Sequence, residues 1–122
     1  LSILVVDDNK DMHSFLEEYF DDSGHKAKSV DSGEMAIEVL ETEDFDLVLC
    51  DIVMPGMSGY EVIAALNSLE QKPKIGMMTG WSEKIKAKEG KGLNIDFIIK
   101  KPFELSVLAD HINDAFGLGR ES

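Results

Sequence analysis

Acidic, hydroxyl and basic side chains follow four short apolar runs of this 122-residue sequence. In chain order they are Asp7 and Asp8, Asp51, Thr79, and Lys100 and Lys101. Each residue alone has an ordinary explanation, because an Asp after a strand often caps the next helix and a Lys is usually solvated. Together, three carboxylates, a hydroxyl and an ammonium predict a shared polar site, because parallel strands bring their carboxyl ends to one edge of a sheet.

The three carboxylates predict a site for a divalent cation. Carboxylates held close together repel one another and need a positive charge nearby. Mg²⁺ takes oxygen ligands and is often held by one or two carboxylates together with a substrate phosphate, which suits this set. Zinc is not expected, because the histidines lack a second ligand at the usual spacing, and we interpret each as an ordinary surface residue. They are His13, His25 and His111.

With a metal ion in place, one carboxylate can attack phosphorus and form an aspartyl phosphate. For phosphoryl transfer, a protein mainly has to position the reactants and stabilise the charge on the phosphoryl oxygens. Lys101 would supply a fixed positive charge, and Thr79 would supply a movable hydrogen-bond donor. The residue types therefore indicate phosphoryl transfer to an aspartate.

Five short apolar runs predict the strands that position these residues. They cover residues 3–6, 47–49, 75–78 and 97–99, with a weaker run at 27–30. Short runs rich in β-branched residues, without alternation, are typical of strands buried on both faces of a parallel sheet.

Amphipathic stretches with helical spacing lie between and after these runs. Their apolar faces are Met12, Phe15, Leu16 and Tyr19; Ala36, Val39 and Leu40; Val62, Ile63, Leu66 and Leu69; and Leu105, Leu108, Ile112 and Ala115. Residues 82–92 are charged with few apolar anchors, so we expect a short or mobile fourth helix there. The alternation predicts right-handed crossovers and a doubly wound α/β fold, a five-stranded parallel sheet with helices on both faces.

Composition narrows the classes of function. With 24 acidic against 12 basic residues, the formal charge of −12 disfavours binding to nucleic acid or an anionic membrane. The length suits one domain. We interpret the lone Cys50 as a small core residue and expect a cytoplasmic protein. No apolar run is long enough to span a bilayer and no signal peptide is evident, while the start at Leu1 suggests a domain of a longer protein.

Four motifs carry a resemblance to a known family. They are ILVVDD at 3–8, LVLCDIVMPGMSGYEV at 47–62, MMTGW at 77–81 and FIIKKPF at 97–103. In this order and spacing they resemble the receiver domain of two-component response regulators, over nearly the whole chain. The resemblance implies a flavodoxin-like fold with strand order 2-1-3-4-5. We expect the receiver domain to cover residues 1–116, with residues 117–122 as a C-terminal tail or the start of a linker.

Carried over by position, the resemblance implies that Asp51 is the phosphoacceptor. Asp7 or Asp8 would bind Mg²⁺ together with Asp51 and the backbone carbonyl of Val53. In the family the second acid of the pair, here Asp8, is the more direct metal ligand.

Thr79 and Lys101 match the family's residues that grasp the phosphoryl group. Lys101 is favoured over Lys100 because it directly precedes Pro102, in a bond that is often cis in the family. The donor would be a phosphohistidine on a sensor histidine kinase or a histidine phosphotransfer protein. The resemblance thus implies a signalling switch of a phosphorelay that only accepts a phosphoryl group and slowly dephosphorylates itself, rather than an enzyme acting on metabolites. We expect its output to pass through the loop after Thr79 and the fourth helix, where low local stability permits a shifted population, to an effector domain or a partner protein.

Two features depart from the family's pattern. An aromatic residue usually stands three positions before the lysine and turns inward behind the threonine. Here that position is Ile98, and the aromatic Phe97 comes one residue earlier, where it is expected to face the other side of the strand. Val53 and Trp81 are apolar at positions often near the attacking water.

Two other functions fit parts of the pattern. A receiver-like interaction module would keep the fold without being phosphorylated, but the complete set of three Asp, one Thr and one Lys argues against it. A Mg²⁺-dependent phosphohydrolase could also form an aspartyl phosphate, but 122 residues leave no room for a cap domain over a substrate.

Trp81 provides a test of phosphate lifetime. If it excludes or misorients water, the aspartyl phosphate of the wild-type protein is long-lived, and Trp81→Ala shortens its lifetime. The measurement is the decay of phosphorylated protein followed by intact mass. An unchanged lifetime would mean that Trp81 only covers the surface of the loop.

Overall fold

The computed structural model describes residues 1–51, 59–69, 72–80, 95–101 and 103–117. Within them five strands form one parallel sheet in the order β2-β1-β3-β4-β5. The strands are β1 (Ser2–Val6), β2 (Lys26–Val30), β3 (Leu47–Asp51), β4 (Lys74–Gly80) and β5 (Phe97–Lys101). The predicted five-stranded parallel sheet and its strand order are therefore confirmed.

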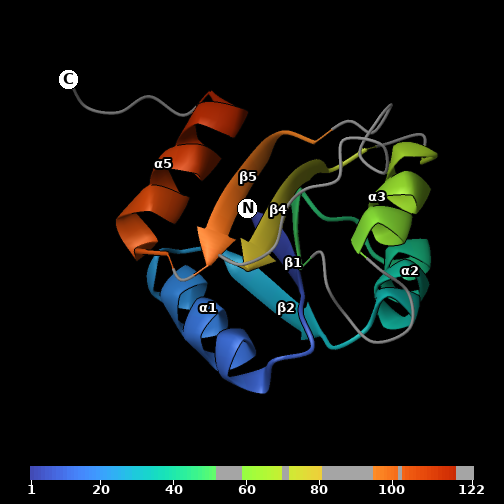
Figure 1. The fold of residues 1–122 in the computed structure, drawn as a ribbon, viewed down its shortest axis with the longest axis horizontal. Coiled ribbons are helices and arrows are strands. Elements are labelled where there is room, and N and C mark those ends of the chain that lie inside the picture. The colour runs from blue at the N-terminus through green and yellow to red at the C-terminus, as the bar shows by residue number, and fades with distance from the viewer. Residues whose placement is uncertain (52–58, 70–71, 81–94, 102, 118–122) are drawn as a thin grey trace.

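Helices cover both faces of the sheet. The described helices are α1 (Lys10–Asp22), α2 (Gly33–Thr42), α3 (Gly59–Asn67) and α5 (Leu105–Phe116). In Figure 1, α1 and α5 lie on one side of the sheet, and α2 and α3 lie on the other. The helix predicted at 82–92 falls outside the described residues. Among the helices of the described ranges, none is long and apolar enough to cross a membrane.

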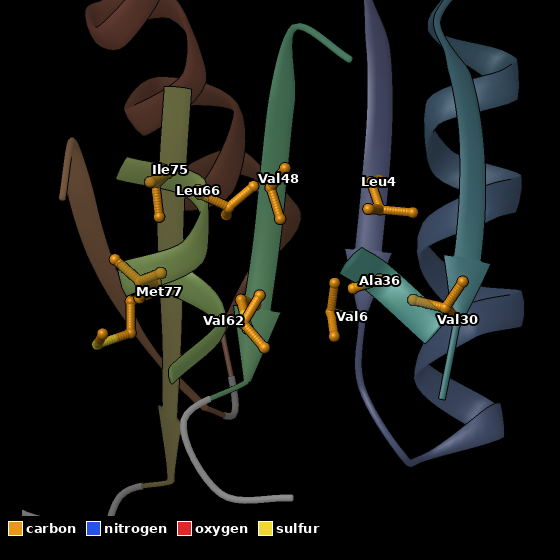
Figure 2. Packing of buried hydrophobic residues seen from close by; sticks show 11 residues of the cluster. Leu4, Val6, Val30, Ala36, Val48, Val62, Leu66, Ile75 and Met77 are labelled. Atoms are coloured by element: carbon orange, nitrogen blue, oxygen red, sulfur yellow. The ribbon is translucent and has the colours of Figure 1, made fainter. Parts of the chain in front are cut away.

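The central strands are buried on both faces because each face packs against a helical layer. Leu4 and Val6 of β1 belong to the core cluster beneath α2 and α3, together with Val48 of β3 (Figure 2). Ile3 and Val5 of β1 belong to the second cluster, beneath α1 and α5. Successive side chains of one strand therefore enter opposite cores, which explains why these runs show no alternation of apolar and polar residues.

The weaker apolar run at residues 27–30 lies in β2, an edge strand of the sheet. β2 carries exposed Lys26 and Lys28 and buries only Val30 completely. Lysines on an edge strand disfavour its pairing with another chain. The mixed character of this run therefore reflects its place at the edge of the sheet.

The prediction that Phe15 belongs to the buried apolar face of the first helix is wrong. Its side chain is 44% exposed, whereas Leu16 and Phe20 of α1 are fully buried. Successive helical residues are about 100° apart, so a helix that meets the sheet along Leu16 and Phe20 turns Phe15 toward solvent. The apolar pattern of α1 is wider than the surface that the sheet covers.

Gly76 of β4 makes room for an aromatic ring from the neighbouring strand. Gly76 pairs with Phe97 of β5 in the sheet register. A Cβ atom at Gly76 would lie 2.5 Å from Cε1 of Phe97 and 2.8 Å from Cδ2 of Leu49. The ring of Phe97 stacks on the imidazole of His111 in α5, with ring centroids 5.2 Å apart. The absence of a side chain at Gly76 thus lets Phe97 lie over β4 and contact α5.

We expect Gly76→Ala to destabilise the protein by about 1–3 kcal/mol, because the added methyl group overpacks the core against Phe97 and Leu49. Urea unfolding followed by circular dichroism measures this change. Phe97→Leu in the same chain should recover part of the loss, because the shorter side chain leaves space for the methyl group. Wild-type stability of Gly76→Ala would contradict the packing described for Phe97.

Candidate functional site

Four strands bring the predicted polar residues to one edge of the sheet. Asp7 directly follows β1, Asp51 ends β3, Thr79 lies one residue before the end of β4, and Lys101 ends β5. All strand pairs are parallel, so these positions share the carboxyl edge. One carboxylate oxygen from each of Asp7, Asp8 and Asp51 lies within 4.8 Å of the other two. The structure therefore brings together the residues that the sequence placed at this edge.

Asp7 is held through both its backbone and its carboxylate. It is fully buried, and its backbone N–H donates to the carbonyl oxygen of Val30 at 3.1 Å. Its Oδ1 accepts a hydrogen bond from the backbone N–H of Asn9 at 2.9 Å, and its Oδ2 accepts one from Nζ of Lys101 at 2.6 Å. The imidazole of His13 is hydrogen-bonded to its backbone carbonyl oxygen. Contacts from β2, β5 and the start of α1 thus determine the orientation of this carboxylate.

Asn9 links the site to the start of α1. As the N-cap residue, its side-chain oxygen accepts a hydrogen bond from the backbone N–H of Asp11 at 2.9 Å. Such a cap satisfies one of the free N–H groups at the start of a helix. The same residue therefore begins α1 and, through its own N–H group, holds the carboxylate of Asp7.

Lys101 forms ion pairs with two of the three acids. Its Nζ lies 2.6 Å from Oδ2 of Asp7 and 3.2 Å from Oδ2 of Asp51. Burial of the ammonium lowers the pKa of Lys101, but the hydrogen bond with Asp7 and the charges of Asp51 and Asp7 outweigh that effect, so the pKa lies above its ordinary value. Lys101 therefore remains a cation at neutral pH.

Asp51 and Thr79 lie near the ends of the neighbouring strands β3 and β4. Asp51 pairs with Met78 of β4, the residue before Thr79. Asp51 is 7% exposed and Thr79 is 5% exposed, so each presents only a small part of its surface at this edge. Both groups are thus held by the sheet rather than by a loop.

Cys50 is a buried core residue, as the sequence indicated. It is fully buried and belongs to the core beneath α2 and α3. Burial, followed by the charges of Asp51 and Asp7, raises the pKa of its thiol. The uncharged thiol packs beside the site without contributing a thiolate.

Asp8 and Lys100 differ from their neighbours in being exposed. Asp8 is exposed while Asp7 is fully buried. Lys100 is likewise exposed, whereas the half-buried Lys101 turns into the site. At each of these strand ends one residue of an adjacent pair contributes to the site and the other faces solvent.

The donor set suits a hard divalent cation. The three clustered side chains offer only carboxylate oxygens, which Mg²⁺ prefers to nitrogen or sulfur. The three carboxylates carry three negative charges, and Lys101 carries one positive charge. One divalent cation would therefore neutralise the charge that remains. Asp8 is exposed and so accessible to an ion that keeps part of its hydration shell.

The histidines are the residues that sequence reasoning misjudged. None of them is an ordinary surface residue, since all three are half-buried. His13 contacts the backbone of Asp7, His111 stacks on Phe97, and His25 lies edge-on to Phe20. Burial lowers the pKa of His25. These contacts join distant parts of the chain, so the spacing of histidines could not predict them.

The departure at β5 is confirmed in the structure. Ile98 is 43% exposed and Phe97 is 8% exposed, so the two side chains face opposite sides of the strand. Phe97 belongs to the core beneath α1 and α5. Val53, Trp81 and Pro102 lie outside the described residues.

The doubly wound α/β fold, with an acidic cluster and a lysine at its carboxyl edge, suits a class of protein that takes a phosphoryl group on an aspartate. Residues 3–113 match the family described as the response regulator receiver domain. The chain belongs to this family, and it is a phosphoacceptor switch rather than a classical enzyme.

Relatives of different lengths contain this domain. The chain is 29% identical over 110 residues to Sporulation initiation phosphotransferase F of Bacillus subtilis (strain 168), covering 90% of this chain and 89% of that protein. It is 30% identical over 122 residues to Virulence sensor protein BvgS of Bordetella pertussis, covering 94% of this chain and 10% of that protein. A response regulator receiver domain protein (CheY-like) from Methanospirillum hungatei has a solved structure with 31% identity and a TM-score of 0.79, covering 97% of this chain and 94% of that one.

Removal of the Lys101 charge tests the ion pairs. In metal-free buffer at pH 7, we expect Lys101→Met to lower the free energy of unfolding by about 2 kcal/mol, because it leaves two largely buried carboxylates without their cation. Urea unfolding measures the change. Lys100→Met is the matched control, and as an exposed substitution it should change stability by less than about 0.5 kcal/mol.

The difference between wild type and Lys101→Met should also depend on pH. The folded-state pKa of Lys101 is raised, so its stabilising contribution is fully present below the ordinary value of 10.5 and is lost as the pH rises through the folded-state value. The difference should therefore stay constant from about pH 7 to pH 9 and shrink at more alkaline pH. A difference that grows with pH would contradict the assigned ion pairs.

Proposed function

We propose that Asp51 is the phosphoacceptor of this receiver domain. The observation that carries the proposal is the position of its carboxylate, 3.2 Å from the Lys101 ammonium and beside the acids Asp7 and Asp8. In the reaction, a carboxylate oxygen of Asp51 attacks phosphorus as the bond from phosphorus to the donor's imidazole nitrogen breaks. The imidazole leaves with the bonding electron pair, and the product is an aspartyl phosphate.

We propose that Mg²⁺ is the cofactor and that Asp7, Asp8, Asp51 and the backbone carbonyl of Val53 hold it or orient its ligands. The support is the all-oxygen donor set and its excess negative charge. When bound, the ion would neutralise charge that develops on the phosphoryl oxygens. The buried Asp7 is positioned by its neighbours, whereas the exposed Asp8 is the more accessible ligand.

The remaining contacts to the phosphoryl group are assigned to Lys101 and Thr79. The Lys101 ammonium already lies beside the Asp51 carboxylate, so it can pair with a phosphoryl oxygen without a large movement. The Thr79 hydroxyl would donate a hydrogen bond to another oxygen. That new contact would shift the conformation of the loop after Thr79 and of the predicted fourth helix. We propose that phosphorylation changes partner interactions through these two segments.

The proposed donor is a phosphohistidine of a sensor histidine kinase or a histidine phosphotransfer protein. Membership of the receiver family supports this class of partner. We further propose that residues 1–116 form the receiver domain, that it acts in the cytoplasm, and that an effector domain or a partner protein provides the output.

The acceptor is tested with a small phosphodonor. Wild-type protein incubated with Mg²⁺ and acetyl phosphate should gain the mass of one phosphoryl group, and Asp51→Asn should gain none, because an amide is a poor nucleophile. Asp44→Asn is the matched control, since Asp44 is exposed and outside the acidic cluster, and it should behave as wild type. EDTA should abolish the adduct on wild-type protein and on Asp44→Asn.

Other outcomes would identify a different function. Absence of an adduct on wild-type protein supports an interaction module that is not phosphorylated. Turnover of many phosphate esters without a stable adduct supports a phosphohydrolase. An adduct of equal yield in Asp51→Asn would show that another residue is the acceptor.

A further inference from the structure

We propose that His13 is a positioning residue of the metal site, which fixes the peptide between Asp7 and Asp8 by donating a hydrogen bond from Nε2 to the carbonyl oxygen of Asp7. The inference rests on the proposed function, because it concerns the acids proposed to hold Mg²⁺. With this role for His13, α1 orients a group of the metal site in addition to covering one face of the sheet.

The geometry follows from the start of α1. The backbone N–H of His13 donates to the carbonyl oxygen of the N-cap residue Asn9 at 3.3 Å, which places His13 in the first full turn of the helix. Side chains of a helix lean toward its N-terminus. The half-buried imidazole is therefore directed back toward the end of β1, where its Nε2 meets the carbonyl oxygen of Asp7.

This hydrogen bond requires a proton on Nε2. A carbonyl oxygen can only accept, so the ring nitrogen must be the donor. Both the neutral Nε2–H tautomer and the imidazolium meet this requirement. The inference therefore does not depend on a change in the protonation of His13.

The peptide that His13 contacts joins the two adjacent acids. The carbonyl of Asp7 and the N–H group of Asp8 belong to one rigid plane, so rotation of that plane moves Asp8 relative to Asp7. The backbone N–H and both carboxylate oxygens of Asp7 have other partners. Asp8 is exposed and follows the end of β1, so its orientation depends strongly on that plane.

The consequence concerns the affinity of the site for its metal ion. Groups that orient metal ligands without touching the ion typically change metal affinity by about 10- to 100-fold when they are removed. His13 holds the peptide plane rather than a carboxylate oxygen, so the expected effect is at the lower end of this range. A histidine that only filled space beside α1 would leave the affinity unchanged.

The test compares variants with and without a donor at position 13 in the full chain. His13→Phe keeps a planar ring but no donor, His13→Ala removes the ring, and His13→Gln keeps an N–H donor on a side chain of similar reach. His25→Gln is the matched control, because His25 is also half-buried but lies away from the acids. Thermal unfolding in EDTA establishes which variants are folded.

Calorimetric titration with Mg²⁺ provides the main measurement. We expect His13→Phe and His13→Ala to bind Mg²⁺ about tenfold more weakly than wild type, with His13→Gln and His25→Gln within about twofold of wild type. Phosphorylation by acetyl phosphate should follow the same order. The Mg²⁺ concentration for half-maximal rate should rise about tenfold in the variants without a donor, while the rate at saturating Mg²⁺ changes much less.

The opposite results would overturn the inference. Wild-type Mg²⁺ affinity in whichever donor-less variant is folded would exclude a positioning role for His13, while leaving Asp51 as the proposed acceptor. Equal loss in His13→Gln and His13→Phe would show that the hydrogen bond is not the cause. Failure of the wild-type protein to bind Mg²⁺ would instead overturn the proposed function and this inference together.

Discussion

The Lys101 ammonium lies between the carboxylates of Asp7 and Asp51, and the rest of the site depends on this arrangement. Three acids gathered at one edge of a sheet repel one another, and Lys101 offsets part of that repulsion. It also joins the ends of β1, β3 and β5, strands that are distant in sequence. The three carboxylates keep an excess of negative charge after this pairing, which is the charge balance of a site that suits a divalent cation.

Asp7 and Asp8 differ in burial. Asp7 is buried and held through its backbone and both carboxylate oxygens, so it serves as a fixed reference within the sheet. Asp8 is exposed and open to solvent. The two acids thus combine a fixed carboxylate with an accessible one, an arrangement that suits a metal site with one side open to solvent. The start of α1 connects them through Asn9 and His13.

β5 has a different relation to the core from the one usual in the family. Its aromatic residue, Phe97, lies over Gly76 and stacks on His111 of α5, so the ring is part of the packed interior. Ile98, at the position of the family's turning aromatic, is exposed. β5 thus joins the site to α5, because its Lys101 pairs with Asp7 and its Phe97 packs in the core beneath α1 and α5.

The amino-acid sequence was enough to predict the parallel sheet, its two helical layers and a shared edge for five polar residues, which are Asp7, Asp8, Asp51, Thr79 and Lys101. These features follow from local periodicity and from the rule that parallel strands share a carboxyl edge. Three other features came to light only in the folded chain: Asp7 rather than Asp8 is buried, His13 contacts Asp7, and Phe15 faces solvent. The reason is physical: these outcomes depend on how packed elements orient individual side chains, as in the pairing of Lys101 with an acid 94 residues earlier in the chain.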